Sequence, residues 1–397
     1  MGIKRTDGLV DFFRKPFFSD YKTLLGLWIL LALAAWATKY FPGSYNNFLI
    51  FKYVYWHVVD LLPLYAPYPD QYADLNHYGP FFSLVIAPFA IAPLWLGLLL
   101  WLVSLSVFLF IATRLLPVER KKQVFIYWFC AHELLTALFM SQFNIAIAAI
   151  IILSFACIEK EKEVGAAFFI MLGTFVKLYG IVGLAFFFFS RHKTKFILSC
   201  IGWAAVMFFA PVVLSNMSYL IEQYKGWFVE LIAKNEANLF SRMQNVSLLG
   251  MVRKISGSPD YPDLYLILPG LAAFALPYLR IAQYRFKAFR LALLASVLMF
   301  TVLFSTGSES STYIIALMGV AIWYTTAPWK RSGLDLGLLV FAFILTSLSP
   351  SDLFPKFLRE QYVYRYALKA LPCVLIWVKL VYEMCTRNYE NSAEYVR

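Results

Sequence analysis

Long apolar runs recur along this chain from Thr23 almost to the C-terminus, with short polar segments between them. A helix needs about 20 apolar residues to cross a hydrocarbon core of about 30 Å. The pattern predicts an all-α polytopic membrane protein with about twelve membrane-spanning helices. We place these spans near residues 23–41, 79–115, 123–140, 143–157, 164–177, 179–190, 196–215, 262–280, 288–306, 311–326, 333–348 and 362–383. Because no long polar linker divides the chain, we expect residues 1–397 to form a single membrane domain.

Two of the apolar stretches are interrupted. Residues 79–115 are too long for one straight helix, and Pro88 and Pro93 would break it. The stretch 164–190 is interrupted after Lys177, which leaves two short segments. A broken helix at membrane depth is tolerated where it lines a cavity or packs inside protein. The break at Lys177 therefore marks a candidate site.

Lysine and arginine residues gather in short clusters between the apolar runs, beginning with Lys4, Arg5 and Arg14. Cytoplasmic loops of membrane proteins carry such an excess of positive charge. Assigning the clusters to the cytoplasm places both Met1 and Arg397 inside. We expect a protein of the plasma (inner) membrane.

This topology leaves three segments of some size outside, residues 43–78, 216–263 and 349–361. Within the first, residues 46–60 alternate apolar and aromatic residues with polar ones. Such a segment can lie flat in the membrane interface. We therefore predict an interfacial helix in the first outer loop.

The composition excludes a soluble protein, since 61% of the residues are hydrophobic and 15% are charged, against about a half and a quarter in soluble domains. The net charge of +12 lies in the topology clusters, so we predict no nucleic-acid partner. The cysteines have no metal-ligand spacing, and we expect no metal, cofactor or disulfide. The chain has no Walker loop, dinucleotide fingerprint or zinc motif, which argues against a nucleotide-sugar site and an ATP-driven pump.

The first outer loop places ionisable and aromatic groups beside the next span, among them Asp70, Asp74, His77 and Tyr78. An aspartate that is partly desolvated near a bilayer is suited to act as a general base. The alternative is a solvated loop built from ordinary turn residues. Both interpretations stay open on the sequence alone.

Several polar residues lie within or next to predicted spans. His132 and Glu133 form an ionisable pair at membrane depth, where such groups are costly and often functional. Gln142 and Asn144 offer amides that could hold sugar hydroxyls, or they form a polar hairpin. Lys177 could bind a phosphate, or its ammonium could extend to the interface.

The remaining candidates lie farther along the chain. Arg242 and Arg253 lie on the predicted outer side, against the usual charge bias, and an arginine fork suits an anionic ligand such as a phosphate. The amides of the same loop include Asn245, followed by Ser247. Glu309 is the one carboxylate of a hydroxyl-rich turn between two apolar spans, which is either a turn or a sugar site.

Four motifs in order resemble the bacterial family 87 glycosyltransferases, over roughly residues 20–330. They are Tyr78-Gly-Pro followed by an apolar helix to Pro93, Ser141-Gln142-Phe-Asn144, Gly165 to Lys177-Leu-Tyr-Gly180, and Asn245-Val-Ser247-Leu248. The family belongs to the C-type glycosyltransferase superfamily and includes polyprenol-phosphate-mannose-dependent mannosyltransferases.

The resemblance implies a C-type glycosyltransferase fold and an inverting displacement on the outer face of the membrane. The donor would be a polyprenyl-phosphate sugar, mannose-like, and the acceptor a lipid-linked or envelope glycan, with membrane lipids as further partners. A carboxylate would take the acceptor proton while cations hold the leaving phosphate.

On this basis we assign Asp74 as the catalytic base, with Asp70 as the nearest alternative. The candidate phosphate ligands are Lys177, Arg242 and Arg253, and the candidate hydroxyl-binding and lining residues are Tyr78, Gln142, Asn144, Asn245, Ser247 and Glu309.

The sequence also departs from the family pattern. The aspartate expected at the start of the first outer helix is replaced by Asn46-Asn47, and an amide cannot take a proton from a hydroxyl. A histidine of the later Ser-Trp-x-His region is missing between Ser308 and Tyr313. A catalytically inactive homologue that binds glycan lipids therefore remains an alternative.

A secondary transporter or flippase of lipid-linked substrates is the other alternative. It would share the spans, the broken helix and a buried ionisable pair such as His132–Glu133. A transporter is expected to concentrate polar residues near mid-membrane in two matching halves. Here they concentrate at outer span ends, and no half-repeat is visible, which favours the transferase.

Overall fold

The computed structural model describes residues 15–258 and 262–390, and within these ranges every regular element is helical. The first half contains η1 (Pro16–Ser19), α2 (Tyr21–Tyr40), α3 (Asn46–Val59), α4 (Phe82–Ile91), α5 (Leu94–Leu115), α6 (Arg120–Phe139), α7 (Asn144–Glu159), α8 (Glu163–Lys177), η2 (Tyr179–Phe189), α9 (Lys193–Phe209) and η3 (Ala210–Leu214). The second half contains α10 (Met217–Asn238), α11 (Leu248–Ser256), α12 (Leu264–Ala275), η4 (Leu276–Leu279), η5 (Ile281–Gln283), α13 (Lys287–Leu303), η6 (Ser310–Thr312), α14 (Tyr313–Thr326), α15 (Gly333–Phe341), η7 (Ala342–Leu348), α16 (Lys356–Leu358), η8 (Arg359–Val363), η9 (Leu368–Ala370) and α17 (Leu371–Thr386). The prediction of an all-α protein is confirmed for this part of the chain.

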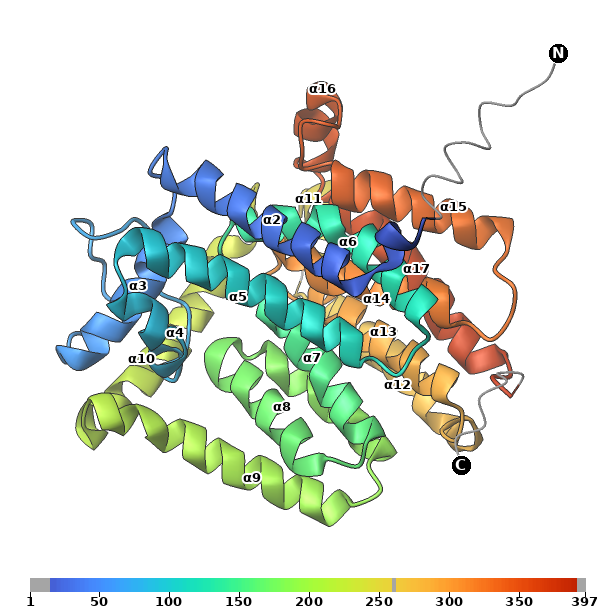
Figure 1. Cartoon of the computed structure of the whole chain (residues 1–397), viewed down its shortest axis with the longest axis horizontal. Coiled ribbons are helices and arrows are strands. Elements are labelled where there is room, and N and C mark those ends of the chain that lie inside the picture. Colours follow the sequence, from blue (N-terminus) through green and yellow to red (C-terminus); the bar gives the residue numbers. More distant parts are fainter. Residues whose placement is uncertain (1–14, 259–261, 391–397) are drawn as a thin grey trace.

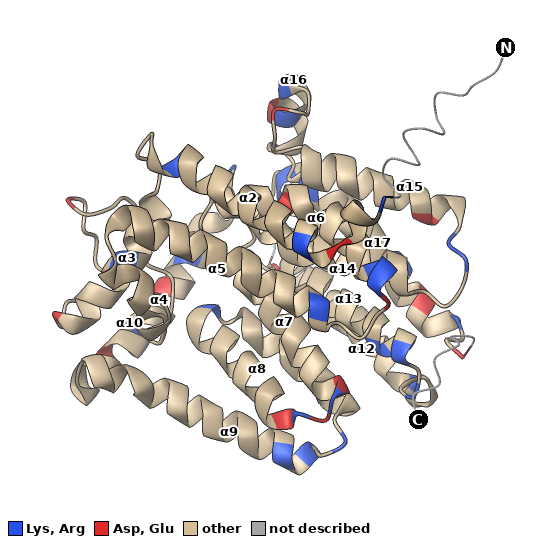
Figure 2. Cartoon of the chain, viewed as in Figure 1, with Lys and Arg blue, Asp and Glu red and all other residues tan. Residues whose placement is uncertain are grey.

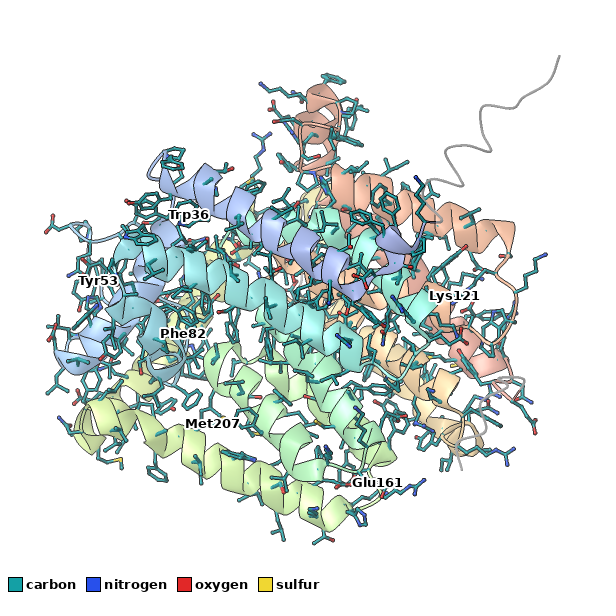
Figure 3. All side chains as sticks on the ribbon, viewed as in Figure 1. Trp36, Tyr53, Phe82, Lys121, Glu161 and Met207 are labelled. Atoms are coloured by element: carbon teal, nitrogen blue, oxygen red, sulfur yellow. The ribbon has the colours of Figure 1, made fainter. Side chains whose placement is uncertain are left out.

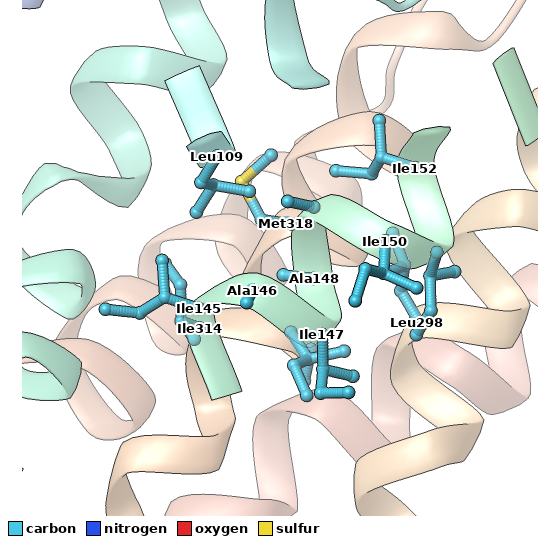
Figure 4. Packing of buried hydrophobic residues seen from close by; sticks show 14 of the residues in the cluster. Leu109, Ile145, Ala146, Ile147, Ala148, Ile150, Ile152, Leu298, Ile314 and Met318 are labelled. Carbon is cyan, nitrogen blue, oxygen red and sulfur yellow. The ribbon is translucent and has the colours of Figure 1, made fainter. Parts of the chain in front are cut away.

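Helix α7 forms the centre of the molecule. Almost all of its side chains are buried, and it packs between α5, α8 and α14. Figure 4 shows Ile145 to Ile152 of α7 against Leu109, Leu298 and Met318. Around this centre, α2 lies along α5 and α6, and α9 lies along α8 at the edge (Figure 1). A helix enclosed by others on all sides reads as uniformly apolar, which is what the sequence of α7 shows.

Among the described residues, three helical segments are long and apolar enough to cross a membrane, namely Tyr21–Tyr40, Leu94–Leu115 and Lys193–Leu214. Their outward side chains are apolar, and Leu30, Ile111 and Leu198 are among the exposed ones. Charged residues lie mostly at helix ends and in connections, while the lengths of α2, α5 and α9 are largely uncharged (Figure 2). The outer surface of these helices is therefore suited to lipid. The count of about twelve crossings stays a prediction.

Both interruptions expected from the sequence are present. The stretch 79–115 divides into α4 and α5 at Pro93. The break expected at Pro88 is wrong, because Pro88 lies inside α4. The helix α8 ends at Lys177 because Leu178 has a left-handed backbone, with φ of 58°. The chain then turns back on α8, and a Cβ atom at Gly180 would overlap the backbone of Ile170 and Thr174. Glycine is required there because the two segments touch through their backbones.

The predicted outer segments contain more helix than expected. The interfacial-helix prediction for residues 46–60 matches a helix, α3, although its depth in a membrane is untested. The segment 216–263 carries the 22-residue helix α10 and the shorter α11. The span expected at 362–383 is wrong at its start, because a left-handed residue, Ala367, interrupts the helix and α17 begins only at Leu371.

The first predicted outer loop lies apart from two of the predicted cytoplasmic clusters (Figure 3). Tyr53 of the first outer loop is on one side, and Lys121 and Glu161 of two predicted cytoplasmic clusters are on the other (Figure 3). The first basic cluster comprises Lys4, Arg5, Arg14, Lys15 and Lys22; its first three members and Arg397 lie outside the described residues. The direction of the chain across the membrane remains a prediction.

Candidate active site

A cavity of about 300 Å³ lies where the first outer loop, α8, α10 and the turn after α13 meet. We call it the transfer cavity. Four residues singled out from the sequence line it, namely Tyr78, Gln142, Lys177 and Glu309. The other lining residues are His77, Leu178, Tyr179, Leu231, Lys234, Asn235, Asn238, Gln244, Ser305, Thr306 and Gly307.

A chain of hydrogen bonds fixes one wall of the transfer cavity. The Lys177 ammonium donates to Asn144 Oδ1 at 2.7 Å, and Asn144 Nδ2 donates to Gln142 Oε1 at 2.8 Å. Gln142 Nε2 donates in turn to Glu309 Oε2 at 2.8 Å. The amide orientations follow from this order, because each amide accepts on one side and donates on the other. A cation is thus linked to a carboxylate across the cavity by two amides.

The break after α8 determines where Lys177 points. Lys177 is the last residue of the helix, where a positive charge is favoured by the helix dipole. Its ammonium lies 5.5 Å from the ring centres of both Tyr78 and Tyr179. Tyr78 is fixed in its turn, since its hydroxyl accepts from the Phe143 backbone N–H at 3.3 Å. The aromatic faces hold the cation at the cavity wall without neutralising it.

A second group of ionisable residues lies at the lip of the transfer cavity. His77 Nδ1 lies 2.9 Å from Glu230 Oε1, and His77 Nε2 lies 3.8 Å from Asp74 Oδ1. Lys234 Nζ lies 3.8 Å from Asp74 Oδ2. Burial, reinforced by the positive charges of Lys234 and Lys177, lowers the pKa of His77 to about 4, although Asp74 opposes the shift. The His77 imidazole is therefore neutral at neutral pH.

Asp74 and Asp70 occupy less buried positions than we expected for a base. The Asp74 side chain is 58% exposed, and Asp70 is exposed as well. Asp74 has a left-handed backbone, and its carboxylate accepts from the Leu75 N–H at 2.8 Å. Of the two, Asp74 is the one next to the cavity, because it touches the lining residues His77 and Lys234.

Asn46, which replaces the expected aspartate, holds this loop in place. Its amide donates to the Ala73 carbonyl at 2.6 Å and accepts from the Ala73 N–H at 2.8 Å. The adjacent Asn47 donates to the Met140 carbonyl at 2.8 Å, just before the Gln142 turn. Asn46 at the start of α3 thus fixes Ala73, the residue before Asp74. The asparagine that replaces the family's aspartate is therefore bonded to the segment that carries the Asp74 carboxylate.

Asn245 and Ser247 are buried behind the wall of the transfer cavity and do not line it. The Ser247 hydroxyl donates to Asn245 Oδ1 at 2.7 Å and accepts from the Gly250 N–H at 3.0 Å, which caps α11. Between them, the Val246 N–H donates to the Ser308 carbonyl at 2.7 Å. This motif fixes the turn that carries Glu309.

The two arginines lie outside the transfer cavity. The Arg253 side chain is 3% exposed, and its Nη2 lies 2.8 Å from Asp263 Oδ1. Arg242 lines a separate pocket with Lys254 and Arg365. Arg253 of α11 is paired with Asp263, and Arg242 lines another pocket than Lys177, so the three cations expected to share one phosphate are not brought together.

The predicted His132–Glu133 pair is not a pair in the structure. Glu133 Oε1 lies 2.7 Å from the Lys369 ammonium, deep between helices, and His132 Nδ1 lies 3.1 Å from the Ser347 hydroxyl. Successive residues of a helix point in different directions, which separates them. Neither residue lines the transfer cavity.

Sequence reasoning did not assign roles to His77, Glu230 and Lys234. His77 was noted without an evident partner, and the partners come from α10, about 150 positions along the chain. The signal that was available is the spacing of Glu230 and Lys234, which are four residues apart and therefore lie on one face of the helix. Among the described residues, no group of three or more histidine, cysteine or acidic side chains is gathered as a metal site.

These features define a helical membrane protein with a polar cavity between its helices, lined by a lysine, amides and a carboxylate. The sequence matches glycosyltransferase family 87 over residues 76–306, which is more than half of the chain. The chain belongs to this family and is a membrane glycosyltransferase. A search of curated proteins finds no match. The matched region includes Lys177 and begins two residues after Asp74.

Proposed function

We propose that this glycosyltransferase transfers a hexose, mannose-like, from a polyprenyl-phosphate sugar to a hydroxyl of a lipid-linked or envelope glycan. The observation that carries the proposal is the Lys177 ammonium on the wall of the transfer cavity, joined through Asn144 and Gln142 to Glu309. In such an arrangement the lysine can bind a phosphate, and the amide and carboxylate groups can bind sugar hydroxyls.

In the proposed reaction, the donor phosphate lies against Lys177, with Lys234 as a second cation on the same cavity. Gln142 and Glu309 hold the sugar hydroxyls. The acceptor oxygen attacks the anomeric carbon on the face opposite the phosphate, and the carbon–oxygen bond to the phosphate breaks with its electron pair. Polyprenyl phosphate leaves as an anion that the lysines stabilise.

The acceptor hydroxyl must lose its proton as the new bond forms. We assign this step to Asp74, which lies at the lip and is 3.8 Å from both His77 and Lys234. His77, which lies between Glu230 and Asp74, acts as a positioning residue that keeps Asp74 toward the cavity.

The outward orientation of the site is part of the proposal. The transfer cavity is built from the predicted outer loops 43–78 and 216–263 together with outer span ends. A cysteine placed at the exposed Asp70, in a cysteine-free background, should react with a membrane-impermeant reagent added outside intact cells. Reaction only after the cells are opened would contradict the orientation.

The test of the activity is transfer itself. The purified protein in lipid discs should release polyprenyl phosphate from one of a panel of radiolabelled polyprenyl-phosphate hexoses and label a component of a membrane lipid extract. If folded protein binds such a donor without turnover, the chain is an inactive binding homologue. If it binds none of them, the assignment of the cavity is wrong.

A further inference from the structure

A second cavity, of about 480 Å³, lies behind the segment that walls the transfer cavity. We call it the basic pocket, and it is lined by Phe240, Arg242, Lys254, Gly257, Glu360, Gln361 and Arg365. Arg242 faces this pocket, whereas Gln244, two residues later, lines the transfer cavity. Lys254 Nζ donates to the Gln244 carbonyl at 2.9 Å. The two cavities are thus separated by one short stretch of chain.

Three cations converge on the basic pocket without carboxylate partners among the described residues. Arg242 donates to the backbone carbonyl of Glu360 at 3.2 Å, and Lys254 donates only to a carbonyl. The lining carboxylate, Glu360, lies 4.0 Å from Lys356 outside the pocket. Burial lowers the pKa of Lys254 to about 8. A bound anion would offset the electrostatic repulsion between these three positive charges. The planar guanidinium groups of the arginines match the geometry of phosphate oxygens.

The surroundings of the basic pocket are apolar and exposed. Phe240 is 48% exposed, Met243 53%, Ile255 59% and Tyr362 47%. Large apolar side chains around a charged centre mark a membrane or ligand contact. Both segments that form the pocket, residues 240–257 and 360–365, adjoin or lie in the predicted outer loops. This combination suits a phosphate attached to a lipid better than a free phosphate ion.

We infer that the basic pocket binds the phosphate group of a lipid-linked acceptor while the transfer cavity holds the donor. The inference rests on the proposed function and narrows its acceptor to a lipid-phosphate-linked glycan, because only such an acceptor brings a second phosphate to the protein. The donor phosphate is assigned to Lys177, which leaves the cations of the basic pocket for the acceptor. A phosphate there places the acceptor glycan one short segment from the sugar to be transferred.

The binding test isolates the basic pocket by using the Lys177→Gln variant, in which the donor site is weakened. Polyprenyl phosphate in phosphatidylcholine discs should still bind to this variant. Adding Arg242→Ala and Arg365→Ala should weaken binding by about tenfold or more for each guanidinium that contacts the phosphate. Both side chains are exposed, so the variants are expected to fold. Lys225→Ala removes an exposed charge that lines neither cavity and should change nothing.

Three outcomes decide the matter. Equal binding with and without the two arginines would overturn the inference. Equal competition by inorganic phosphate would overturn the lipid-linked ligand, because the chains would then contribute nothing. In the transfer reaction, the double variant should raise the KM for the lipid acceptor and leave donor binding unchanged. If the protein binds lipid phosphate in the basic pocket but transfers no sugar, the proposed function is contradicted and the pocket is not. If the protein transfers sugar and the double variant has an unchanged acceptor KM, the pocket is contradicted and the proposed function is not.

Discussion

Replacement of Lys177 by glutamine should remove one of the two positive charges of the proposed donor site, and leave Lys234 and the fold intact. In the structure, the Lys177 ammonium makes one side-chain hydrogen bond, to Asn144 Oδ1 at 2.7 Å, and Asn144 is fully buried. Glutamine is one atom shorter and carries an N–H that can still donate toward Asn144. The stability of Lys177→Gln should therefore fall by at most about 1 kcal/mol, the net contribution of a hydrogen bond.

The effect on the donor should be much larger. A hydrogen bond to a charged group contributes about 1.5–3 kcal/mol, so donor affinity should fall by roughly tenfold to 150-fold. Lys177→Met, which has no N–H, should lose the same affinity and also destabilise the protein by about 1–3 kcal/mol, because Asn144 Oδ1 is left without a donor. Donor affinity is measured by displacement of a labelled polyprenyl-phosphate sugar in lipid discs, and stability by thermal unfolding.

A matched control removes a lysine from the same outer region. Lys225 on α10 is exposed and does not line the transfer cavity, so Lys225→Gln should bind the donor as the unchanged protein does. Unchanged affinity in a folded Lys177→Gln variant would refute the assignment of the phosphate to this lysine. If Lys177→Gln and Lys225→Gln lose the same donor affinity, Lys177 acts only through long-range attraction of the anionic donor and does not contact its phosphate.

Three further predictions concern the lip and the wall of the site. Asp74→Asn should keep donor binding and lower turnover by at least about 100-fold, and near-normal turnover together with a loss in Asp70→Asn would move the base to that residue. Because the pKa of His77 lies at about 4, the unfolded chain takes up a proton first as the pH falls from about 6.5, so stability should decrease toward pH 4. His77→Gln should remove that part of the pH dependence measured by denaturant unfolding. Arg253→Ala should destabilise the fold by about 3 kcal/mol by leaving Asp263 without its partner, and weaker donor binding at unchanged stability would restore its proposed phosphate role.

The helix breaks could be predicted from the sequence because their causes are local. Pro93 cannot continue α4, and the short segments on both sides of Lys177 needed an interruption. The twelve-span count could not be settled in this way. Helix α7 has 16 residues and is buried on all sides. Its apolar sequence is explained by packing against other helices, so an apolar run does not by itself identify a helix that contacts lipid.

The members of the candidate site could be identified one by one, but their partners could not. Gln142, Lys177 and Glu309 each stood out as polar residues among apolar ones. Their connection depends on how α7, α8 and the turn before α14 pack together, which residue spacing does not encode. The Glu230 partner of His77 comes from a helix in a segment predicted as a loop.

The arginines show the opposite limit of sequence reasoning. Arg242 and Arg253 are close in the chain and were expected to act on one phosphate. The helix α11 begins between them, and its apolar face turns Arg253 inward against Asp263. Arg242 stays outside beside Lys254 and Arg365. Charge on the outer side indicated an anionic ligand, while the helix boundary determined that these residues do not share a site.

A structure of the protein with a non-transferable polyprenyl-phosphate sugar analogue would test the central claim most directly. We expect the analogue's phosphate within hydrogen-bonding distance of Lys177 Nζ and its sugar between Gln142 and Glu309, with Asp74 and His77 on the acceptor side. An analogue bound elsewhere, with the transfer cavity empty, would contradict the assignment of this cavity as the site of glycosyl transfer.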